Sequence, residues 1–265
     1  MNPISPLFEK IDASIGKKVN LIETSYARYA LRAVMACVFL TLGTGVAYSI
    51  AMKGEHIAPG LGKMLYAFMF SWSLVMILYM NAELGTSNML YMTVGYYRRR
   101  LSFMTASKIL WTCILFNLIG GFIFAYLISF TGPFQDLAKD NYLFESAAMK
   151  LSKPTLQILV EGIFANIVVN VAVLVSMRMK DDAGKIMAII FIIFIFAYLG
   201  FEHVIANFPS LTLAYFASNG TIEGMTVGSV LHNLTFALIG NYIGGGLIMG
   251  LGYAWLNDTR STYVD

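Results

Sequence analysis

Six long apolar stretches run along the 265-residue chain, and the shorter segments between them carry most of its charged residues. A membrane-spanning helix needs about 20 mostly apolar residues, and the stretches are of that order. We therefore predict six transmembrane helices, over residues 33–52, 64–82, 109–129, 155–177, 186–201 and 225–255.

The second and fifth stretches are longer than one span, because they continue to about residues 97 and 218, and polar residues interrupt both. Each interruption contains the pattern Glu-x-x-x-x-Asn, at Glu83 and Asn88 and again at Glu202 and Asn207. Backbone amides cannot stay unpaired in lipid. We therefore expect each break to line a cavity or to pack against protein.

A second motif follows in each half of the chain. The third stretch contains Asn117-x-x-Gly-Gly, and the sixth contains Asn241-x-x-Gly-Gly. Because three helices separate the two copies, the second half must enter the membrane from the opposite side. The sequence thus predicts an all-α membrane fold of six helices in a 3+3 inverted repeat, whose broken second and fifth helices form the transport site.

Basic residues in the short connections predict the orientation. They gather in residues 10–18, 98–100 and 178–185, which six spans place on one side. We expect that side to be the cytoplasm, with both termini inside a multi-pass protein of the inner or plasma membrane. The predicted single membrane domain comprises a cytoplasmic segment (1–28), a first repeat (29–129), an outer loop (130–154), a second repeat (155–257) and a cytoplasmic tail (258–265). The first segment is weakly amphipathic, which favours a short helix on the membrane surface.

Composition supports this assignment, since 58% of the residues are hydrophobic and only 12% are charged. A soluble domain has about twice that charged fraction, so the composition excludes one. The net charge of +3 gives no reason to expect a nucleic-acid partner. Cys37 and Cys113 lie inside apolar stretches without metal-ligand spacing. We predict no cofactor, no metal site and, without an apolar leader, no cleavable signal peptide.

The two breaks also suggest a chemistry. Each begins a second half-helix, near Ser87 and near Asn207, whose N-terminus presents free N–H groups and partial positive charge. Two such ends that face one space favour an anion. We expect Glu83 and Glu202 to cap these ends, while Asn88, Asn207 and Asn241 hold the loops.

His203 is the titratable intramembrane side chain with the strongest claim to a function, because a histidine pKa can cross physiological pH. The alternative is a buried neutral histidine that only hydrogen-bonds to the backbone. We expect Glu202 or a backbone carbonyl to fix its tautomer.

Four segments together resemble the formate/nitrite transporter family of pentameric anion channels. They are residues 200–207 (GFEHVIAN), 240–245 (GNYIGG), 81–88 (NAELGTSN) and 161–166 (EGIFAN), and the resemblance extends from about residue 22 to 257. It implies an aquaporin-like fold and a homopentamer in the lipid bilayer, with one pore in each protomer. It also implies that the substrate is a small monovalent anion.

The resemblance implies roles for individual residues of the substrate pathway. They are a central His203, Thr86 in the first broken loop, a pore-facing Asn166, a vestibule lysine at Lys150, a cytoplasmic constriction at Phe70, Leu74 and Phe196, and an outer constriction at Leu84. The chain departs from the family at Gly85, where a bulky residue is usual, and at Asn170, where a small apolar residue or cysteine is common. Both departures are expected near the pore, and Gly85 suggests a wider outer constriction.

We predict a channel or transporter for small anions of weak acids, with formate first and with nitrite, hydrosulfide, acetate or lactate as alternatives. Crossing as the neutral acid would avoid the cost of a bare charge between apolar rings, which fits proton-coupled transport. A water or glycerol channel is the nearest rival, but it would carry two Asn-Pro-Ala motifs, which this sequence lacks. An intramembrane protease would need a nucleophile motif of the Gly-x-Ser-x-Gly type, which Gly85-Thr-Ser-Asn does not match. We therefore do not expect an enzyme.

Overall fold

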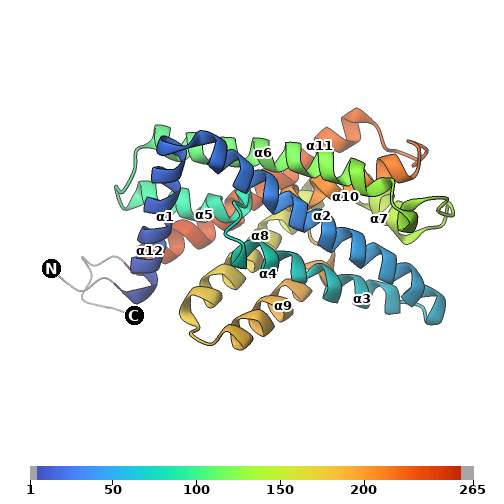
Figure 1. Ribbon diagram of the computed structural model, residues 1–265, viewed down its shortest axis with the longest axis horizontal. Coiled ribbons are helices and arrows are strands. Elements are labelled where there is room, and N and C mark those ends of the chain that lie inside the picture. The colour runs from blue at the N-terminus through green and yellow to red at the C-terminus, as the bar shows by residue number, and fades with distance from the viewer. Residues whose placement is uncertain (1–4, 258–265) are drawn as a thin grey trace.

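The computed structural model describes residues 5–257, and all regular structure within that range is helical (Figure 1). The expected tail at 258–265 and the first four residues of the N-terminal segment lie outside the described residues. Within them, six helical segments are long and apolar enough to cross a membrane.

These segments agree with the predicted spans. They are α2 (Tyr26–Ile57), α3 with α4 (Leu61–Phe70 and Trp72–Tyr79), α6 (Phe103–Ser129), α8 (Thr155–Arg178), α9 (Asp182–Leu199), and α11 with the π-helix η2 and α12 (Val227–Asn241, Tyr242–Leu251 and Gly252–Leu256).

Both predicted breaks are present. The second span stops at Tyr79 and resumes as the half-helix α5 (Gly85–Tyr97), and the fifth stops at Leu199 and resumes as α10 (Val204–Ala217). Gly200 ends α9 in the left-handed conformation (φ 73°), which glycine adopts without steric cost. The half-helix α5 begins two residues before the expected Ser87, and α10 begins three residues before the expected Asn207.

A further amphipathic helix precedes each three-helix half. The helix α1 (Pro6–Thr24) lies before the first half, as the sequence suggested, and buries Phe8, Ile11 and Ile15. The segment expected as an outer loop contains the 3₁₀ turn η1 (Gly132–Phe134) and the helix α7 (Tyr142–Ser152). Because α7 spans only 11 residues, its apolar face is too short for a membrane-span search to detect.

Contacts join the three basic segments at one end of the bundle, the end at which α1 and α12 lie (Figure 1). Asp12 of α1 pairs with Arg98 at 3.2 Å and with Arg100 at 2.9 Å. Lys10 donates to the carbonyl of Met177 at the end of α8. The helix α7 lies at the opposite end (Figure 1).

The Gly-Gly pairs let helices approach closely. A Cβ at Gly120 would lie 2.7 Å from the carbonyl oxygen of Val34, and a Cβ at Gly244 would lie 2.1 Å from that of Ile163. Because real Cβ atoms do not approach so closely, α6 can pack on α2, and η2 on α8, only with glycine at these positions. This packing holds the helices that carry the asparagine anchors described below.

Candidate transport pathway

Two cavities lie toward opposite ends of the bundle, and each has basic side chains in its wall. The first, called the α7 cavity, has a volume of about 280 Å³ and is lined in part by Lys150 and Lys153. The second, called the α1 cavity, has a volume of about 240 Å³ and is lined in part by Lys17, Lys18 and Arg32. An anion that enters either cavity therefore meets positive charge.

A narrow central chamber of about 20 Å³ lies between the two cavities. Phe70 and Phe196 line both the chamber and the α7 cavity, whereas Ile77 and Leu84 line both the chamber and the α1 cavity. His203 also lies in the chamber wall. The other lining residues are Leu40, Ser73, Leu74, Val169 and Ile193. The three spaces therefore form one row through the protein, and apolar side chains separate them.

With the basic α1 end as the cytoplasmic end, the two constrictions lie on the opposite sides from those that the resemblance implied. Leu84, expected at the outer constriction, lines the α1 cavity together with Lys18. Phe70 and Phe196, expected at the cytoplasmic constriction, line the α7 cavity, and Leu74 lines only the central chamber. The reason is the chain direction, because the second span enters from the end that carries α7 and reaches residue 70 before residue 84.

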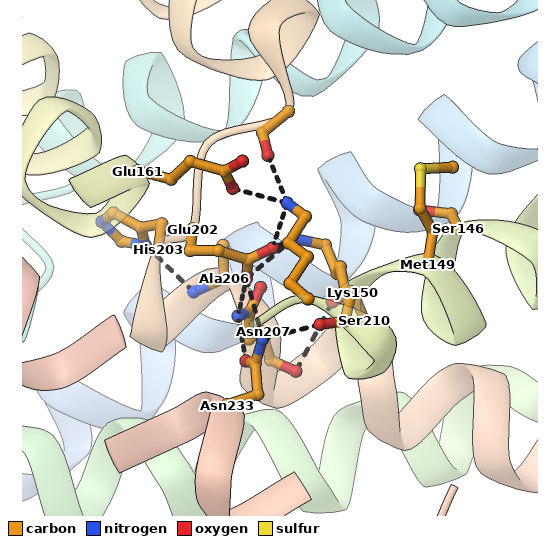
Figure 2. Close-up of polar contacts among 12 residues, drawn as sticks. Ser146, Met149, Lys150, Glu161, Glu202, His203, Ala206, Asn207, Ser210 and Asn233 are labelled. Atoms are coloured by element: carbon orange, nitrogen blue, oxygen red, sulfur yellow. Dashed lines mark hydrogen bonds and ion pairs between the residues drawn. The ribbon is translucent and has the colours of Figure 1, made fainter. Parts of the chain in front are cut away.

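His203 is the one titratable side chain in the lining of the central chamber. Its Nε2 lies 2.8 Å from Thr86 Oγ1, and its Nδ1 accepts a hydrogen bond from the backbone N–H of Ala206 at 3.1 Å (Figure 2). An acceptor nitrogen carries no proton, so the ring is neutral and its proton lies on Nε2, facing Thr86. A backbone amide thus fixes the tautomer, and the expectation that Glu202 or a carbonyl does so is wrong.

Both half-helices begin at this chamber. His203 is the N-cap of α10, and Leu84 is the N-cap of α5. Each of these residues also lines the chamber. Since a helix N-terminus carries about half a positive charge, the two ends add positive potential at the narrowest part of the row.

An asparagine on α6 holds the first break. Asn117 accepts from the N–H of Gly85 at 2.8 Å and donates to the carbonyl of Glu83 at 2.9 Å and to that of Ala33 at 2.7 Å. One side chain therefore satisfies backbone groups on both sides of the break that would otherwise be unpaired.

Asn241 makes the equivalent set of bonds at the second break. It accepts from the N–H of Val204 at 2.8 Å and donates to the carbonyl of Glu202 at 2.9 Å and to that of Gly162 at 2.8 Å. The two Asn-x-x-Gly-Gly motifs thus perform the same structural task in the two halves, as an inverted repeat requires.

Glu83 does not cap its half-helix as we expected, because α5 has no side-chain cap. Instead its Oε2 accepts from Lys18 Nζ at 2.7 Å and from Asn88 Nδ2 at 2.9 Å. The side chains of Glu83 and Lys18 are only 7% and 12% exposed. The carboxylate is therefore held by a nearly buried ion pair with α1.

Glu202 does not cap either, since the cap of α10 is His203. The Glu202 carboxylate is fully buried and accepts from Lys153 at 2.6 Å and from Lys150 at 3.3 Å (Figure 2). Asn207 and Asn233 also donate to it, at 2.7 and 3.2 Å. Two lysines and two amides therefore surround one carboxylate.

The two lysines of the α7 cavity differ in how firmly they are held. Lys153 also donates to the Gly200 carbonyl at 3.0 Å and to Glu161 at 2.5 Å, whereas Glu202 is the one hydrogen-bond partner of the Lys150 ammonium among the described residues. Burial lowers the pKa of Lys150, although Glu202 opposes this. Burial would also lower the pKa of Lys153, but the carboxylates of Glu202 and Glu161 outweigh it and raise that pKa. Lys150 is thus the lysine more available to a passing anion.

Asn166, implied to face the pore, lies outside the lining of the central chamber and is fully buried. Its Nδ2 donates to the carbonyl oxygens of Thr86 at 3.1 Å and Asn241 at 2.7 Å. Because backbone carbonyls occupy both hydrogens, the side chain holds the loops and does not face the substrate path.

Gly85 and Asn170, expected near the pore, are not in the lining of any of the three cavities, although each directly follows a lining residue, Leu84 or Val169. A Cβ at Gly85 would lie 2.9 Å from Ile114 Cγ1 and 3.1 Å from Asn117 Oδ1. A larger residue would therefore point into α6 and not narrow the pore. Asn170 is fully buried on α8, where it donates to Asn166.

Sequence reasoning missed the partners of the two glutamates, above all Lys18 and Lys153. A signal was available, because each half is preceded by an amphipathic segment with lysines and each half contains one break with a glutamate. The repeat therefore predicts one lysine-bearing helix for each carboxylate. The separations of 65 residues for Lys18 and 49 for Lys153 hide the pairs from a local pattern search.

A row of cavities through six membrane spans with paired broken helices is the architecture of a membrane channel or transporter. A sequence model described as formate/nitrite transporter matches residues 5–255, and the chain belongs to this family. The family consists of transporters and channels, not enzymes.

Individual proteins are similar over most of their length. The chain is 28% identical to the Bacillus subtilis (strain 168) protein named uncharacterized transporter YwcJ, over 94% of this chain and 96% of that one. It is 26% identical to the nitrite transporter NirC of Escherichia coli (strain K12), over 92% and 89%.

Solved structures share the fold. The structure of an FNT family ion channel superposes with a TM-score of 0.86 at 24% identity, covering 94% of this chain and 98% of that one. The structure of a pentameric formate channel with formate bound superposes with a TM-score of 0.74 at 23% identity, over 89% and 98%.

Proposed function

We propose that the protein conducts small monovalent anions of weak acids, with formate as its first substrate, through the row of α7 cavity, central chamber and α1 cavity. The observation that carries the proposal is this row itself, in which lysines line both wide cavities and apolar side chains with one histidine line the narrow part. The presence of a formate channel and of a nitrite transporter among the similar proteins supports the substrate class.

The electrostatics of the row favour an anion at both entrances and oppose it in the middle. Lys150 in one cavity and Lys17 with Arg32 in the other attract the anion, and the two half-helix N-termini add to this attraction. The central chamber is so narrow and apolar that a bare charge would lose most of its hydration there. A weak acid that takes up a proton in the cavity crosses the chamber as a neutral molecule, which makes transport proton-coupled.

The state of His203 supports a donor role and not a proton-supply role. Its Nδ1 is occupied by the N–H of Ala206, so a second ring proton would have to break this cap. The Nε2–H, which faces Thr86, can donate to a passing anion or acid in place of the Thr86 hydroxyl, without any change in ring charge. We therefore favour cavity water as the proton source.

The proposal includes an assembly and an orientation. The similar formate channel is pentameric, which supports a homopentamer here with one pore in each protomer, and this assembly fits the complete row inside one chain. The basic segments at the α1 end support a cytoplasmic location for that end, with both termini inside the cell membrane.

The test is transport by the purified protein in liposomes loaded with a pH dye. Formate, nitrite, hydrosulfide, acetate and lactate gradients are applied in turn, and osmotic swelling reports water flow. We expect formate to be taken up fastest. The internal pH should change in step with the anion flux. Water flow without anion uptake would overturn the proposal in favour of a neutral-solute channel, whereas faster nitrite uptake would keep the class and change the first substrate.

A further inference from the structure

The amide of Asn166 bridges the two broken loops from behind the central chamber. It donates to the carbonyl of Thr86 in the first loop at 3.1 Å and to the carbonyl of Asn241, the anchor of the second loop, at 2.7 Å. The sulfur of Met89 lies 3.3 Å from the same nitrogen. The loops are therefore joined twice, once by this amide and once by the bond between Thr86 and His203 at 2.8 Å.

The orientation of the Asn166 amide depends on Asn170, one turn further along α8. Asn170 Nδ2 donates to Asn166 Oδ1 at 2.9 Å and to the Asn166 carbonyl at 2.8 Å. With a donor at its oxygen, the Asn166 amide can present only its nitrogen to Thr86 and Asn241. Without that donor, the amide can rotate by half a turn and set an oxygen against the carbonyl of Thr86, which would push the loop away.

Asn170 itself is poorly explained by packing. It is fully buried, and its Oδ1 has no hydrogen-bond partner among residues 5–257. An unpaired buried oxygen is unfavourable, whereas an apolar side chain of the same size would avoid this cost. The feature of Asn170 that an apolar side chain would lack is therefore the hydrogen bond that it donates to Asn166.

The neighbouring helix leaves little space beside this pair. A Cβ at Gly245 of η2 would lie 2.1 Å from Asn166 Nδ2 and 2.8 Å from Asn170 Nδ2. The π-helix thus passes directly against both amides, and glycine at this position is what admits them.

We propose that Asn170 is a positioning residue, which locks the Asn166 amide so that Thr86 is held at hydrogen-bond distance from His203. The inference rests on the proposed function, because it assigns Asn170 an effect on conduction through the central chamber. It acts through Asn166 and Thr86, and it does not touch the substrate path.

Two variants of similar size separate the donor from its bulk. Asn170→Leu removes the donor. Asn170→Asp places a carboxyl group in an apolar site, where burial favours the protonated form, and that O–H can still donate to Asn166. We expect Asn170→Leu to lower the maximal formate flux by about tenfold while the half-saturating concentration, set in the cavities, changes little. We expect Asn170→Asp to stay within about twofold of the parent.

A double-variant cycle shows whether Asn170 acts through Asn166. If it does, adding Asn170→Leu to Asn166→Leu lowers the flux no further, because the group that Asn170 orients is already absent. Additive losses, or parent flux in Asn170→Leu, would overturn the proposal. If Asn170→Leu does not assemble, the smaller Asn170→Val, which also lacks a donor, takes its place with the same expected outcomes.

A readout that does not require transport separates this inference from the proposed function. In ¹⁵N-histidine-labelled protein, the His203 Nε2 resonance, identified by its loss in His203→Gln, reports the bond to Thr86. It should shift in Asn170→Leu and keep its position in Asn170→Asp. An unchanged resonance in Asn170→Leu contradicts the positioning role whether or not formate is transported, whereas a shift without any anion transport by the parent contradicts only the proposed function.

Discussion

At the scale of single residues, the number of hydrogen-bond partners of a charged side chain decides whether it can bind a substrate. Lys150 and Lys153 share one carboxylate, yet Lys153 contacts three acceptors and Lys150 contacts only Glu202 among the described residues. A side chain with fixed partners shapes the loop, and one with spare donors can meet a substrate. The same distinction separates His203, whose Nε2–H meets only the Thr86 hydroxyl beside the chamber, from Asn166, whose amide hydrogens are both held by backbone carbonyls.

Alanine substitutions of the two lysines should therefore have different effects on transport and stability. Lys150→Ala should raise the half-saturating formate concentration several-fold at low salt and less at high salt, because a partly exposed charge is screened. Lys153→Ala should reduce the thermal stability of the detergent-solubilised protein as well, since it leaves buried Glu202 with Lys150, at 3.3 Å, as its one remaining cation among the described residues. Initial uptake rates at two ionic strengths, together with melting curves, check both. Indistinguishable profiles for the two variants would contradict the division of roles.

Two variants can separate the role of His203 as the N-cap of α10 from its role as a hydrogen-bond donor. His203→Asn keeps an N-cap acceptor and an amide donor, so it should assemble and conduct formate. His203→Phe removes the acceptor for Ala206 and the donor to Thr86, and loss of a cap alone costs about 1 kcal/mol. We expect Phe to abolish flux, measured beside the yield of folded protein. Loss of pH-dependent uptake in His203→Asn as well would instead assign the proton relay to the imidazole.

Gly85 offers a test of side-chain direction. Since a Cβ there points at Ile114 and Asn117, Gly85→Phe should lower assembly and reduce formate and lactate flux by the same factor. Gly85→Ala, the matched smaller change, should do so more weakly. The measurement is the ratio of the two fluxes per folded protein. A selective loss of lactate would show that the residue does act as a size filter.

At the scale of elements, the two halves use the same devices with different strengths. Each break is held by an asparagine of the following span, and each carboxylate by a lysine of the preceding amphipathic helix or its C-cap. The second half adds Lys153, Glu161 and Asn233, so its break carries the denser polar network.

The two anchors should be equivalent. Asn117→Leu and Asn241→Leu each leave one N–H and two carbonyls without their side-chain partner, and each unsatisfied buried group costs about 1–3 kcal/mol. We expect both variants to lose most folded protein, with parent-like yield for a surface control such as Asn20→Leu, at an exposed position of α1. Size-exclusion yield measures this. A large loss for one anchor and none for the other would show that the repeat is symmetric in shape but not in stability.

Much of this could be predicted from the sequence, because the informative patterns are short. The spans follow from apolar length, and the breaks from the paired Glu and Asn positions. A motif does not report the direction of a side chain, so the resemblance implied a pore-facing Asn166 and a Gly85 near the pore, whereas neither residue is in the cavity linings. With the α1 end in the cytoplasm, the sides that the resemblance implied for Phe70 and Leu84 are exchanged, because a constriction's place in a motif does not say which end of the bundle it approaches. Pairs such as Lys18 with Glu83 form only in three dimensions.

At the scale of the whole molecule, the polarity of the bundle can be tested. The α1 end gathers Arg98, Arg100 and Lys10, which favours the cytoplasm. In intact cells, Arg99→Cys should resist a membrane-impermeant thiol reagent, and Glu223→Cys, in the turn at the other end, should react readily. Cys37 and Cys113 are buried, so background labelling should be low. The reverse pattern would invert the orientation and the proposed direction of both cavities.

The pairing of each glutamate with an earlier lysine also has a consequence for biosynthesis. Lys18 leaves the ribosome 65 residues before Glu83, and Lys150 and Lys153 leave it 52 and 49 residues before Glu202. Each carboxylate therefore enters the bilayer after its counter-charge has been made, and both partners belong to the same half. Neither half has to hold a bare carboxylate in lipid while it waits for the other. Because of the order of translation, a counter-charge is thus present for each of the two glutamates before that glutamate is inserted into the membrane.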